Sequence, residues 1–387
     1  MTQSQRMNTF GESIFTHLAH LRAKRQAEGL EVIDLSIGAP NIPPHKRIRE
    51  ALSQAALDSH NYIYAITDTS DLQEAVAHWY KRRYNVTINP KTQVTSLLGS
   101  QEGLSHLGLT LVNEGDVVLV PDPCYPIFRD GPLLAGADVH YMPLLKENDY
   151  LIDFDTIDPA LADKAVLMVV SYPNNPTCGI ANDDFYHRLI AFAKAHDIIV
   201  LHDNAYSEII YEGLGRSFLE YEGAIDVGLE FNSLSKTYGM AGARVGFAIG
   251  REDLINTLKT LKSNLDYGMF LPIQKAAIEA ITGDQSIVED TRNAYIHRKD
   301  VLLNAFGKVG WDIDPPRGSM FIWAKIPNTY KTSEEFTCDL FDKTGVLVVP
   351  GSAFGEHGEG FVRMALVQDD DVIERAAELM DKAHIFR

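Results

Sequence analysis

The sequence is poor in cysteine, in long apolar runs and in positive charge. Its three cysteines, Cys124, Cys178 and Cys338, are too few for a disulfide framework in a chain of 387 residues, and none has zinc-ligand spacing. No segment approaches the roughly 20 apolar residues of a membrane helix. The first ten residues lack the apolar core of a signal peptide. We therefore predict a cytoplasmic protein with no metal site and no membrane span.

The shortage of basic residues restricts the possible partners. The chain has 35 Lys and Arg against 53 Asp and Glu, which gives a formal net charge of −18. This charge disfavours nucleic acids and anionic membranes as partners. An anionic ligand must therefore be bound by local cations rather than by the overall field of the protein.

Apolar runs alternate with amphipathic helices through the middle of the chain. The runs are continuous, which predicts strands covered on both faces, at 94–98, 116–120, 165–170, 198–201 and 244–249. Residues 183–196 have the apolar periodicity of a helix. This alternation predicts a large α/β domain with three αβα layers over residues 46–285.

The pattern changes after about residue 285. A long helix is followed by predicted short strands at 311–313, 320–324 and 346–349, and by a closing helix at 371–384. The strand candidate 32–35 has no partner nearby in sequence. We therefore predict a smaller α+β domain that combines residues 1–45 with residues 286–387.

Lys236 lies at the end of a predicted buried segment, in Ser233-Leu234-Ser235-Lys236. This is a poor place for a solvent-facing charge, but a good one for an amine that forms a Schiff base with an aldehyde cofactor. Arg244 follows closely and adds a cation that can hold a phosphate. Pyridoxal phosphate requires both groups, so these residues predict a site for it.

The segment Gly99 to Gly103 follows a predicted strand and opens a helix. Backbone N–H groups at a helix N-terminus, with the hydroxyl of Ser100, form an anion site. Taken alone, the segment is more simply explained as a serine N-cap. Together with Ser233, Ser235 and Arg244 it predicts a single phosphate site.

Asp203 lies just past the carboxyl end of the strand at 198–201, where open α/β sheets bind ligands. A carboxylate there is costly unless it is paired. A protonated pyridine nitrogen is a suitable partner, and the pair keeps the ring able to accept electrons. The alternative is an aspartate that caps the next turn. Tyr206 either hydrogen-bonds the phenolic oxygen of the cofactor or packs in the core.

Two turns and one strand complete the candidate site. Tyr125 follows a strand and can stack on a planar ring, and Asn175 can donate its amide to the phenolic oxygen. Turns of this kind are more often structural. Arg363 lies in an apolar strand, where its planar fork suits either a substrate α-carboxylate or a structural ion pair. Gly38 either lets the backbone approach that carboxylate or serves as a simple turn glycine.

These elements, in this order, resemble the class I and II (fold type I) pyridoxal-phosphate-dependent aminotransferases over most of the chain. The most specific parts are Asn-Asn-Pro-Thr at 174–177, Asp203 with Tyr206, Ser-x-Ser-Lys at 233–236 with Arg244, and Arg363. The resemblance implies catalytic roles for Lys236, Asp203 and Tyr206. It implies substrate contacts for Gly38, Asn175 and Arg363. It also implies a cofactor site made of Ser100, Gln101, Tyr125, Asn175, Asp203, Tyr206, Ser233, Ser235, Lys236 and Arg244.

The resemblance further implies a homodimer with shared active sites, in which a tyrosine of the partner completes each site. Tyr64 is the favoured candidate and Tyr62 the alternative. The spacing from these tyrosines to Leu72 departs from the family pattern, and Asp68 stands where that pattern has a glycine. Two other departures are Cys178, where a glycine is usual, and Ala243, where a bulky aromatic is common. Neither departure removes a catalytic group.

The implied reaction moves an amino group between an L-amino acid and a 2-oxo acid by a ping-pong mechanism. The motifs are most similar to the branch that contains LL-diaminopimelate, alanine and broad-specificity aminotransferases, which makes LL-diaminopimelate the first candidate substrate. A broad aromatic or alanine aminotransferase and a β-lyase that cleaves C–S bonds are the alternatives. A nicotinamide-dependent dehydrogenase is disfavoured, because no G-x-G-x-x-G follows an early strand.

Overall fold

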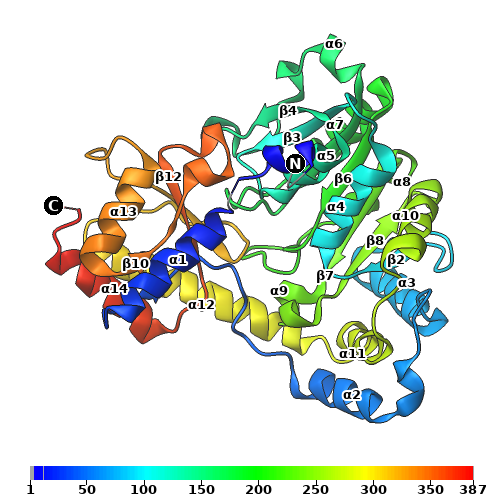
Figure 1. Ribbon diagram of the computed structural model, residues 1–387, viewed down its shortest axis with the longest axis horizontal. Coiled ribbons are helices and arrows are strands. Elements are labelled where there is room, and N and C mark those ends of the chain that lie inside the picture. The colour runs from blue at the N-terminus through cyan, green and yellow to red at the C-terminus, as the bar shows by residue number, and fades with distance from the viewer. Residues whose placement is uncertain (1–3, 12, 387) are drawn as a thin grey trace.

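The computed structural model, which describes residues 4–11 and 13–386, is built around a seven-stranded sheet (Figure 1). The strand order is β2-β8-β7-β6-β5-β3-β4, and only β8 runs antiparallel to its neighbours. The strands are β2 (Val94–Leu97), β3 (Val117–Asp122), β4 (Asp138–Pro143), β5 (Ala165–Ser171), β6 (Ile199–Asp203), β7 (Gly228–Ser233) and β8 (Gly246–Gly250).

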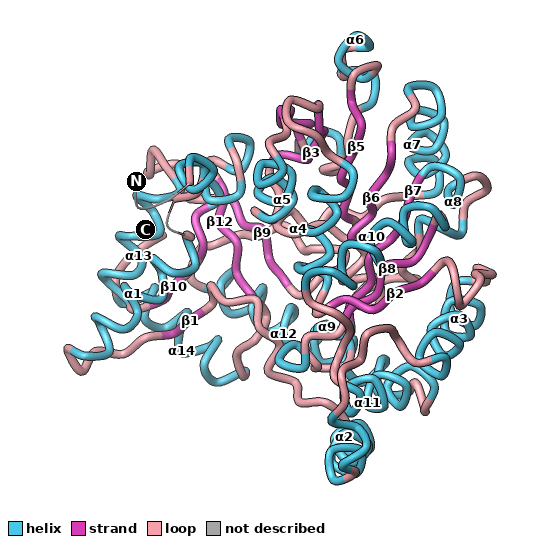
Figure 2. The backbone as a smooth tube through the Cα atoms, turned by 45° about the vertical axis from the view of Figure 1, so that its right-hand side comes forward, coloured by secondary structure: helices cyan, strands magenta, loops and turns pink. Residues whose placement is uncertain are grey.

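The sheet is covered on both faces, as its continuous apolar strands predict. Along β5, Leu167 and Val169 belong to one buried cluster, whereas Met168 and Val170 belong to another. Side chains of α4 (Ser100–Leu111), α5 (Ile127–Ala135) and α10 (Glu252–Leu265) fill the first cluster. Those of α3 (Ser70–Tyr84), α7 (Asp183–His196) and α11 (Leu271–Thr282) fill the second. The predicted three-layer αβα architecture is therefore confirmed (Figure 2).

A second core lies beside the sheet. It contains the antiparallel sheet β11-β12-β9 and the parallel pair β1-β10. The strands are β1 (Ile33–Asp34), β9 (Phe321–Lys325), β10 (Val346–Leu347), β11 (Val349–Pro350) and β12 (Phe361–Ala365). The main helices of this part are α1 (Ile14–Ala27), α12 (Ser286–Lys308), α13 (Ser333–Thr344) and α14 (Asp370–Lys382). Helix α2 (Lys46–Leu57) packs on α11 instead, and short α6 (Pro159–Ala162), α8 (Ala224–Val227) and α9 (Leu234–Thr237) lie near the main sheet.

Most predicted strands are confirmed within one or two residues, but the strand at 311–313 is wrong. Residues 311–313 pair with no strand; instead the indole nitrogen of Trp311 donates a hydrogen bond to the carbonyl of Lys325 at 3.0 Å. The domain boundaries at residues 45 and 285 stay a proposal. The parallel pairing of Ile33 with Val346 supports the grouping of the N-terminal segment with the C-terminal one.

The topology brings five chain segments to one edge of the main sheet. Since β2, β3, β5, β6 and β7 are parallel, the loops that follow them emerge at their common carboxyl edge. The antiparallel β8 begins at this edge, so Arg244, two residues before it, arrives there as well. Among the helices of the described residues, none has the length and apolarity needed to cross a membrane.

Candidate active site

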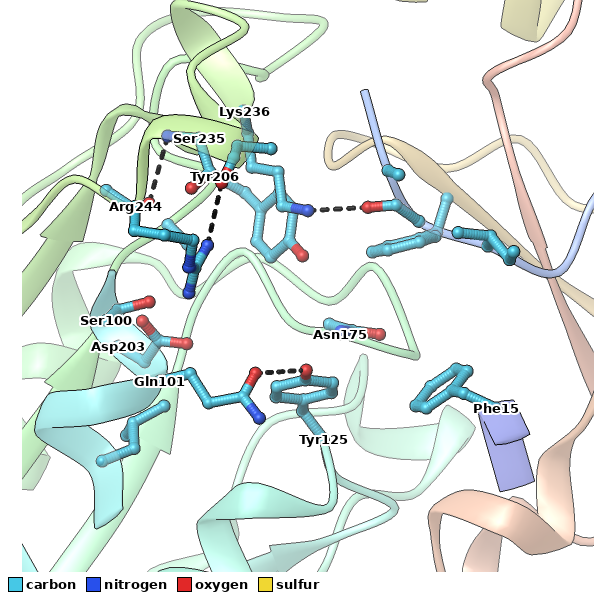
Figure 3. Close-up of a pocket in the computed structure, with 18 of the residues that line it drawn as sticks. Phe15, Ser100, Gln101, Tyr125, Asn175, Asp203, Tyr206, Ser235, Lys236 and Arg244 are labelled. Carbon is cyan, nitrogen blue, oxygen red and sulfur yellow. Dashed lines mark hydrogen bonds between the residues drawn. The ribbon is translucent and has the colours of Figure 1, made fainter. Parts of the chain in front are cut away.

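A cavity of about 330 Å³ opens at the carboxyl edge of the sheet (Figure 3). All the residues predicted for the site line it except Tyr64; they are Gly38, Ser100, Gln101, Tyr125, Asn175, Asp203, Tyr206, Ser233, Ser235, Lys236, Arg244 and Arg363. They come from segments between residues 38 and 363, and most stand directly after a parallel strand. The fold thus brings the sequence motifs together in one place.

Lys236 is a largely buried amine in the lining of the cavity. It lies on α9, and its Nζ donates a hydrogen bond to the carbonyl of Gly38 at 2.7 Å. Burial lowers the pKa of Lys236 to about 8, with the nearby cations Arg363 and Arg244 adding to the effect and Asp203 opposing it. A lowered pKa increases the neutral fraction of the amine, which is the form that attacks a carbonyl.

Asp203 is a buried carboxylate with an unused oxygen. It is 6% exposed, and its Oδ1 has no hydrogen-bond partner among the described residues. Burial raises the pKa of Asp203 to about 7, the charge of Glu230 raises it further, and Lys236 opposes the shift. An unpaired buried carboxylate is costly, so the geometry suits a ligand that offers an N–H to this oxygen.

The N-terminus of α4 and Arg244 form one wall of the cavity. Gly99 precedes the helix at φ +79°, and a Cβ added there would lie 2.2 Å from Nη2 of Arg244. A Cβ on Gly246 would lie 2.8 Å from the backbone nitrogen of Ser100. The guanidinium is therefore packed directly against the helix N-terminus, and the two positive groups face the same space. Such an arrangement binds anions.

Arg363 is almost completely buried, at 2% exposed. It donates hydrogen bonds to Oδ1 of Asn175 and to the carbonyl of Ser36, both at 2.9 Å, and its Nε has no partner among the described residues. Three rings surround the guanidinium carbon, Phe321 at 4.3 Å, Phe354 at 4.8 Å and Phe15 at 5.5 Å. Burial lowers the pKa of Arg363 to about 10. No acidic side chain among the described residues forms an ion pair with it, contrary to the alternative of a structural pair.

Two tyrosines complete the polar lining. The hydroxyl of Tyr125 donates to Oε1 of Gln101 at 2.9 Å, which orients that ring across the cavity (Figure 3). The ring of Tyr206 lies 6.0 Å from Nζ of Lys236. Burial raises the pKa of both phenols, so both are protonated hydrogen-bond donors at neutral pH.

The sequence motifs assign no individual role to the apolar part of the lining, which consists of Phe15, Ile37, Ala39, Leu104, Ala205, Ala241 and Phe321. Phe15 comes from α1 and points into the cavity from the side opposite the sheet (Figure 3). No local motif marks such residues. The ring of Phe321 packs closely against the backbone of Gly38, since a Cβ on that glycine would lie 2.7 Å from the ring. Tyr64 is outside this cavity and 82% exposed.

Comparison with known proteins agrees with this geometry. A family model described as aminotransferase class I and II matches residues 31–379. The LL-diaminopimelate aminotransferase of Dehalococcoides mccartyi is 42% identical over 377 residues, with 97% of each chain covered. The enzyme of the same name from Halothermothrix orenii is 40% identical and covers 100% of this chain and 99% of its own.

Solved structures also show a close similarity to this chain. A substrate-bound structure of BacF from Bacillus subtilis superposes with a TM-score of 0.97 at 37% identity, covering 100% of this chain and 99% of BacF. An aminotransferase from Staphylococcus aureus superposes with a TM-score of 0.91 at 32% identity, covering 100% of both chains. The chain therefore belongs to the class I and II aminotransferases, and it is a pyridoxal-phosphate-dependent transaminase.

Proposed function

We propose that the cavity at the carboxyl edge of the sheet holds pyridoxal phosphate and a substrate amino acid, with Lys236, Asp203 and Arg363 in the main roles. One observation carries the proposal: a lysine with a lowered pKa, a buried carboxylate with an unpaired oxygen and a buried arginine with no acidic partner line the same space. Each of these groups is costly alone and suits a complementary group of a cofactor–substrate pair.

The described residues fit this cofactor at two points. The unpaired Oδ1 of Asp203 suits the protonated ring nitrogen, because a positive partner there would keep this buried carboxylate ionised. The wall formed by Arg244 and the N-terminus of α4 suits the phosphate, together with the hydroxyls of Ser100, Ser233 and Ser235. Tyr125 is assigned to stack on the ring, Gln101 to support Tyr125, and Tyr206 with Asn175 to bind the phenolic oxygen.

The roles in catalysis follow from these positions. Bound pyridoxal phosphate supplies an aldehyde that condenses with amines and a ring that accepts electrons. Lys236 would hold the cofactor through its amine, and its Nζ, once free, would be the group that takes the proton from the substrate α-carbon. Arg363 holds the α-carboxylate, which orients the bond that must break. Water would release the first 2-oxo acid while the amino group stays on the enzyme-bound cofactor, and a second 2-oxo acid would then accept that group in a ping-pong sequence.

Lys236 provides the decisive test. The purified holoprotein should show the visible absorbance of the bound cofactor, and borohydride should fix the cofactor covalently on Lys236, as peptide mass spectrometry would show. Lys236→Ala should lose both the adduct and turnover, whereas Lys146→Ala, at a lysine paired with Asp314 outside the cavity, should keep both. Turnover of Lys236→Ala at the wild-type rate would exclude the proposed role.

The amino donor has two candidates. LL-diaminopimelate is the substrate named for relatives that are 40–42% identical over almost the whole chain. A broad aromatic or alanine aminotransferase is the second candidate, favoured by the apolar part of the lining. A β-lyase on the same scaffold would release ammonia or a thiol without a 2-oxo acid, so an assay with and without 2-oxoglutarate distinguishes lyase from transferase.

An exposed apolar surface supports a homodimer. Tyr62, Ile63, Tyr64 and Ile66 are each at least 60% exposed, and the ring of Tyr64 lies 5.8 Å from that of Tyr267. Contiguous apolar surface of this kind usually marks an interface. We assign Tyr64, with Tyr62 as the alternative, to the active site of the partner. Light scattering should give twice the chain mass of 43.1 kDa, and a monomeric active enzyme would exclude shared sites.

The cytoplasmic location is also a proposal. All three cysteines are free: Cys124 and Cys178 are buried, and Cys338 is exposed. Unpaired thiols are typical of proteins from reducing compartments. Cell fractionation should recover the protein with the soluble cytoplasmic markers, and recovery from the culture medium would exclude this location.

A further inference from the structure

The cavity has no polar group left for the side chain of the substrate once the proposed roles are assigned. Its described lining residues include three cations, Lys236, Arg244 and Arg363, and one carboxylate, Asp203. Each is committed to the cofactor or to the α-amino and α-carboxylate groups. The described lining residues without a role are all apolar, namely Phe15, Ile37, Ala39, Leu104, Ala205, Ala241 and Phe321.

Several of these apolar residues adjoin the groups that would hold the substrate backbone. The rings of Phe15 and Phe321 lie 5.5 and 4.3 Å from the guanidinium carbon of Arg363. Ile37 is a chain neighbour of Gly38, whose carbonyl accepts the hydrogen bond from Lys236. A substrate bound through its carboxylate to Arg363 and through its amine near Lys236 therefore has an apolar wall beside its α-carbon.

We propose that the preferred amino donor has an uncharged apolar side chain, aromatic or branched aliphatic, and that Phe15 determines this specificity. The proposal rests on the proposed function and narrows it. The far end of LL-diaminopimelate carries a second carboxylate and a second ammonium group. Beside the rings of Phe15 and Phe321 those charges would find no uncommitted polar partner among the described lining residues, whereas an apolar side chain gains by leaving water there.

The exposed segment assigned to the partner subunit does not supply the missing charges. Its large side chains at 62–66 are tyrosine and isoleucine. Asp68, the next acidic residue, already accepts hydrogen bonds from the backbone nitrogen of Ser96 at 2.7 Å and from Oγ1 of Thr95 at 3.3 Å. A second copy that placed residues 62–66 at the cavity would therefore add apolar and phenolic surface there and no charged side chain.

The half-reaction of the holoenzyme tests the proposal. An amino acid is mixed with the enzyme without a 2-oxo acid, and the change in cofactor absorbance is followed by stopped flow. The second-order rate constants for L-phenylalanine and L-leucine should exceed that for LL-diaminopimelate by about 10-fold or more. An equal or larger constant for LL-diaminopimelate would overturn the inference while leaving the aminotransferase function intact. No reaction with L-phenylalanine or L-leucine would also overturn the inference, whereas a holoprotein that formed no borohydride adduct on Lys236 would instead exclude the proposed function itself.

The role of Phe15 has its own test. Phe15→Ala should lower the rate constant for L-phenylalanine by roughly 10- to 100-fold and that for L-alanine by less than about 3-fold, because alanine has no side chain to reach the ring. Leu21→Ala is the matched control, since Leu21 lies on the same helix but lines a different groove. It should leave both constants unchanged. An equal loss for both substrates in Phe15→Ala would show a merely structural role and would overturn the assignment of Phe15.

Discussion

Replacing Gly99 by alanine tests the proposed phosphate site, because both the backbone conformation and the contact with Arg244 require a glycine at this position. Its backbone, at φ +79° and ψ 152°, lies in a region almost restricted to glycine, and a side chain there costs about 1–3 kcal/mol. A Cβ would also lie 2.2 Å from Nη2 of Arg244, so the guanidinium has to move away from the helix N-terminus. A charge-assisted hydrogen bond to the phosphate is worth about 1.5–3 kcal/mol.

The loss of that one bond predicts a 10- to 150-fold weaker affinity for pyridoxal phosphate, at about 1.4 kcal/mol per tenfold change. Titration of the cofactor-free protein, followed by absorbance or tryptophan fluorescence, measures this affinity. Pyridoxal, which lacks the phosphate, should bind Gly99→Ala and wild type within about 3-fold of each other. The difference between the two ligands separates a local effect on the phosphate from a general loss of structure.

Gly213→Ala is the matched control for backbone strain. Gly213 has nearly the same φ, +78°, but a Cβ there would meet nothing within 4 Å. Gly213→Ala should therefore lose stability through strain and keep the wild-type affinity for pyridoxal phosphate. If Gly99→Ala bound pyridoxal phosphate as tightly as this control, Arg244 and the N-terminus of α4 would not form the phosphate site.

Three further perturbations follow from the buried charges. Arg363→Gln should reduce kcat/KM by about 100-fold or more with little change in cofactor affinity, because a bidentate charged contact to the α-carboxylate is lost; an unchanged kcat/KM would contradict the assignment. In the folded protein the pKa of Asp203 is about 7, above the 3.8 of a free aspartate, so its contribution to the stability of the cofactor-free protein falls as pH rises between these values. Asp203→Asn should therefore raise the free energy of unfolding of the cofactor-free protein by up to about 4 kcal/mol above pH 7 and by little near pH 4, as urea unfolding would measure; a gain that did not depend on pH would refute this explanation. Glu230→Gln should cost about 3–5 kcal/mol in the same assay, since this carboxylate is fully buried and lies 2.9 Å from Nδ1 of His202; a loss below about 1 kcal/mol would mean that the pair contributes little.

The polar half of the site was predictable because each motif directly follows a strand. In parallel sheets the ends of sequential strands meet at one edge, so residues as distant as Ser100 and Lys236 converge once the strands are recognised. Each turn alone was compatible with a purely structural role, whereas the order of the motifs along the chain indicated the aminotransferase family. The sequence pattern therefore predicted correctly that the polar residues converge in one cavity.

The apolar half and two strands were not predictable for physical reasons. Phe15 reaches the cavity from α1, and nothing in its neighbourhood distinguishes it from a core phenylalanine. Strand β7 contains Glu230, which interrupts the apolar pattern; its carboxylate is buried because it accepts hydrogen bonds from Tyr80 at 2.8 Å and from Ser217 at 2.9 Å. Strand β4 is at the edge of the sheet and partly exposed, so it lacks a continuous apolar run.

The charges of the cavity explain how a strongly acidic protein binds two anions. Three cations face one carboxylate among the described lining residues, in a chain with a formal net charge of −18. Burial and mutual repulsion hold the pKa of Lys236 near 8, so a larger fraction of this amine is neutral at neutral pH than for an exposed lysine. A phosphate beside Arg244 and a carboxylate on Arg363 would remove this repulsion and favour the protonated form. The same cations that attract the two anions therefore raise the neutral, nucleophilic fraction of Lys236, whereas the bound anions would favour its protonated form when it takes up the α-proton.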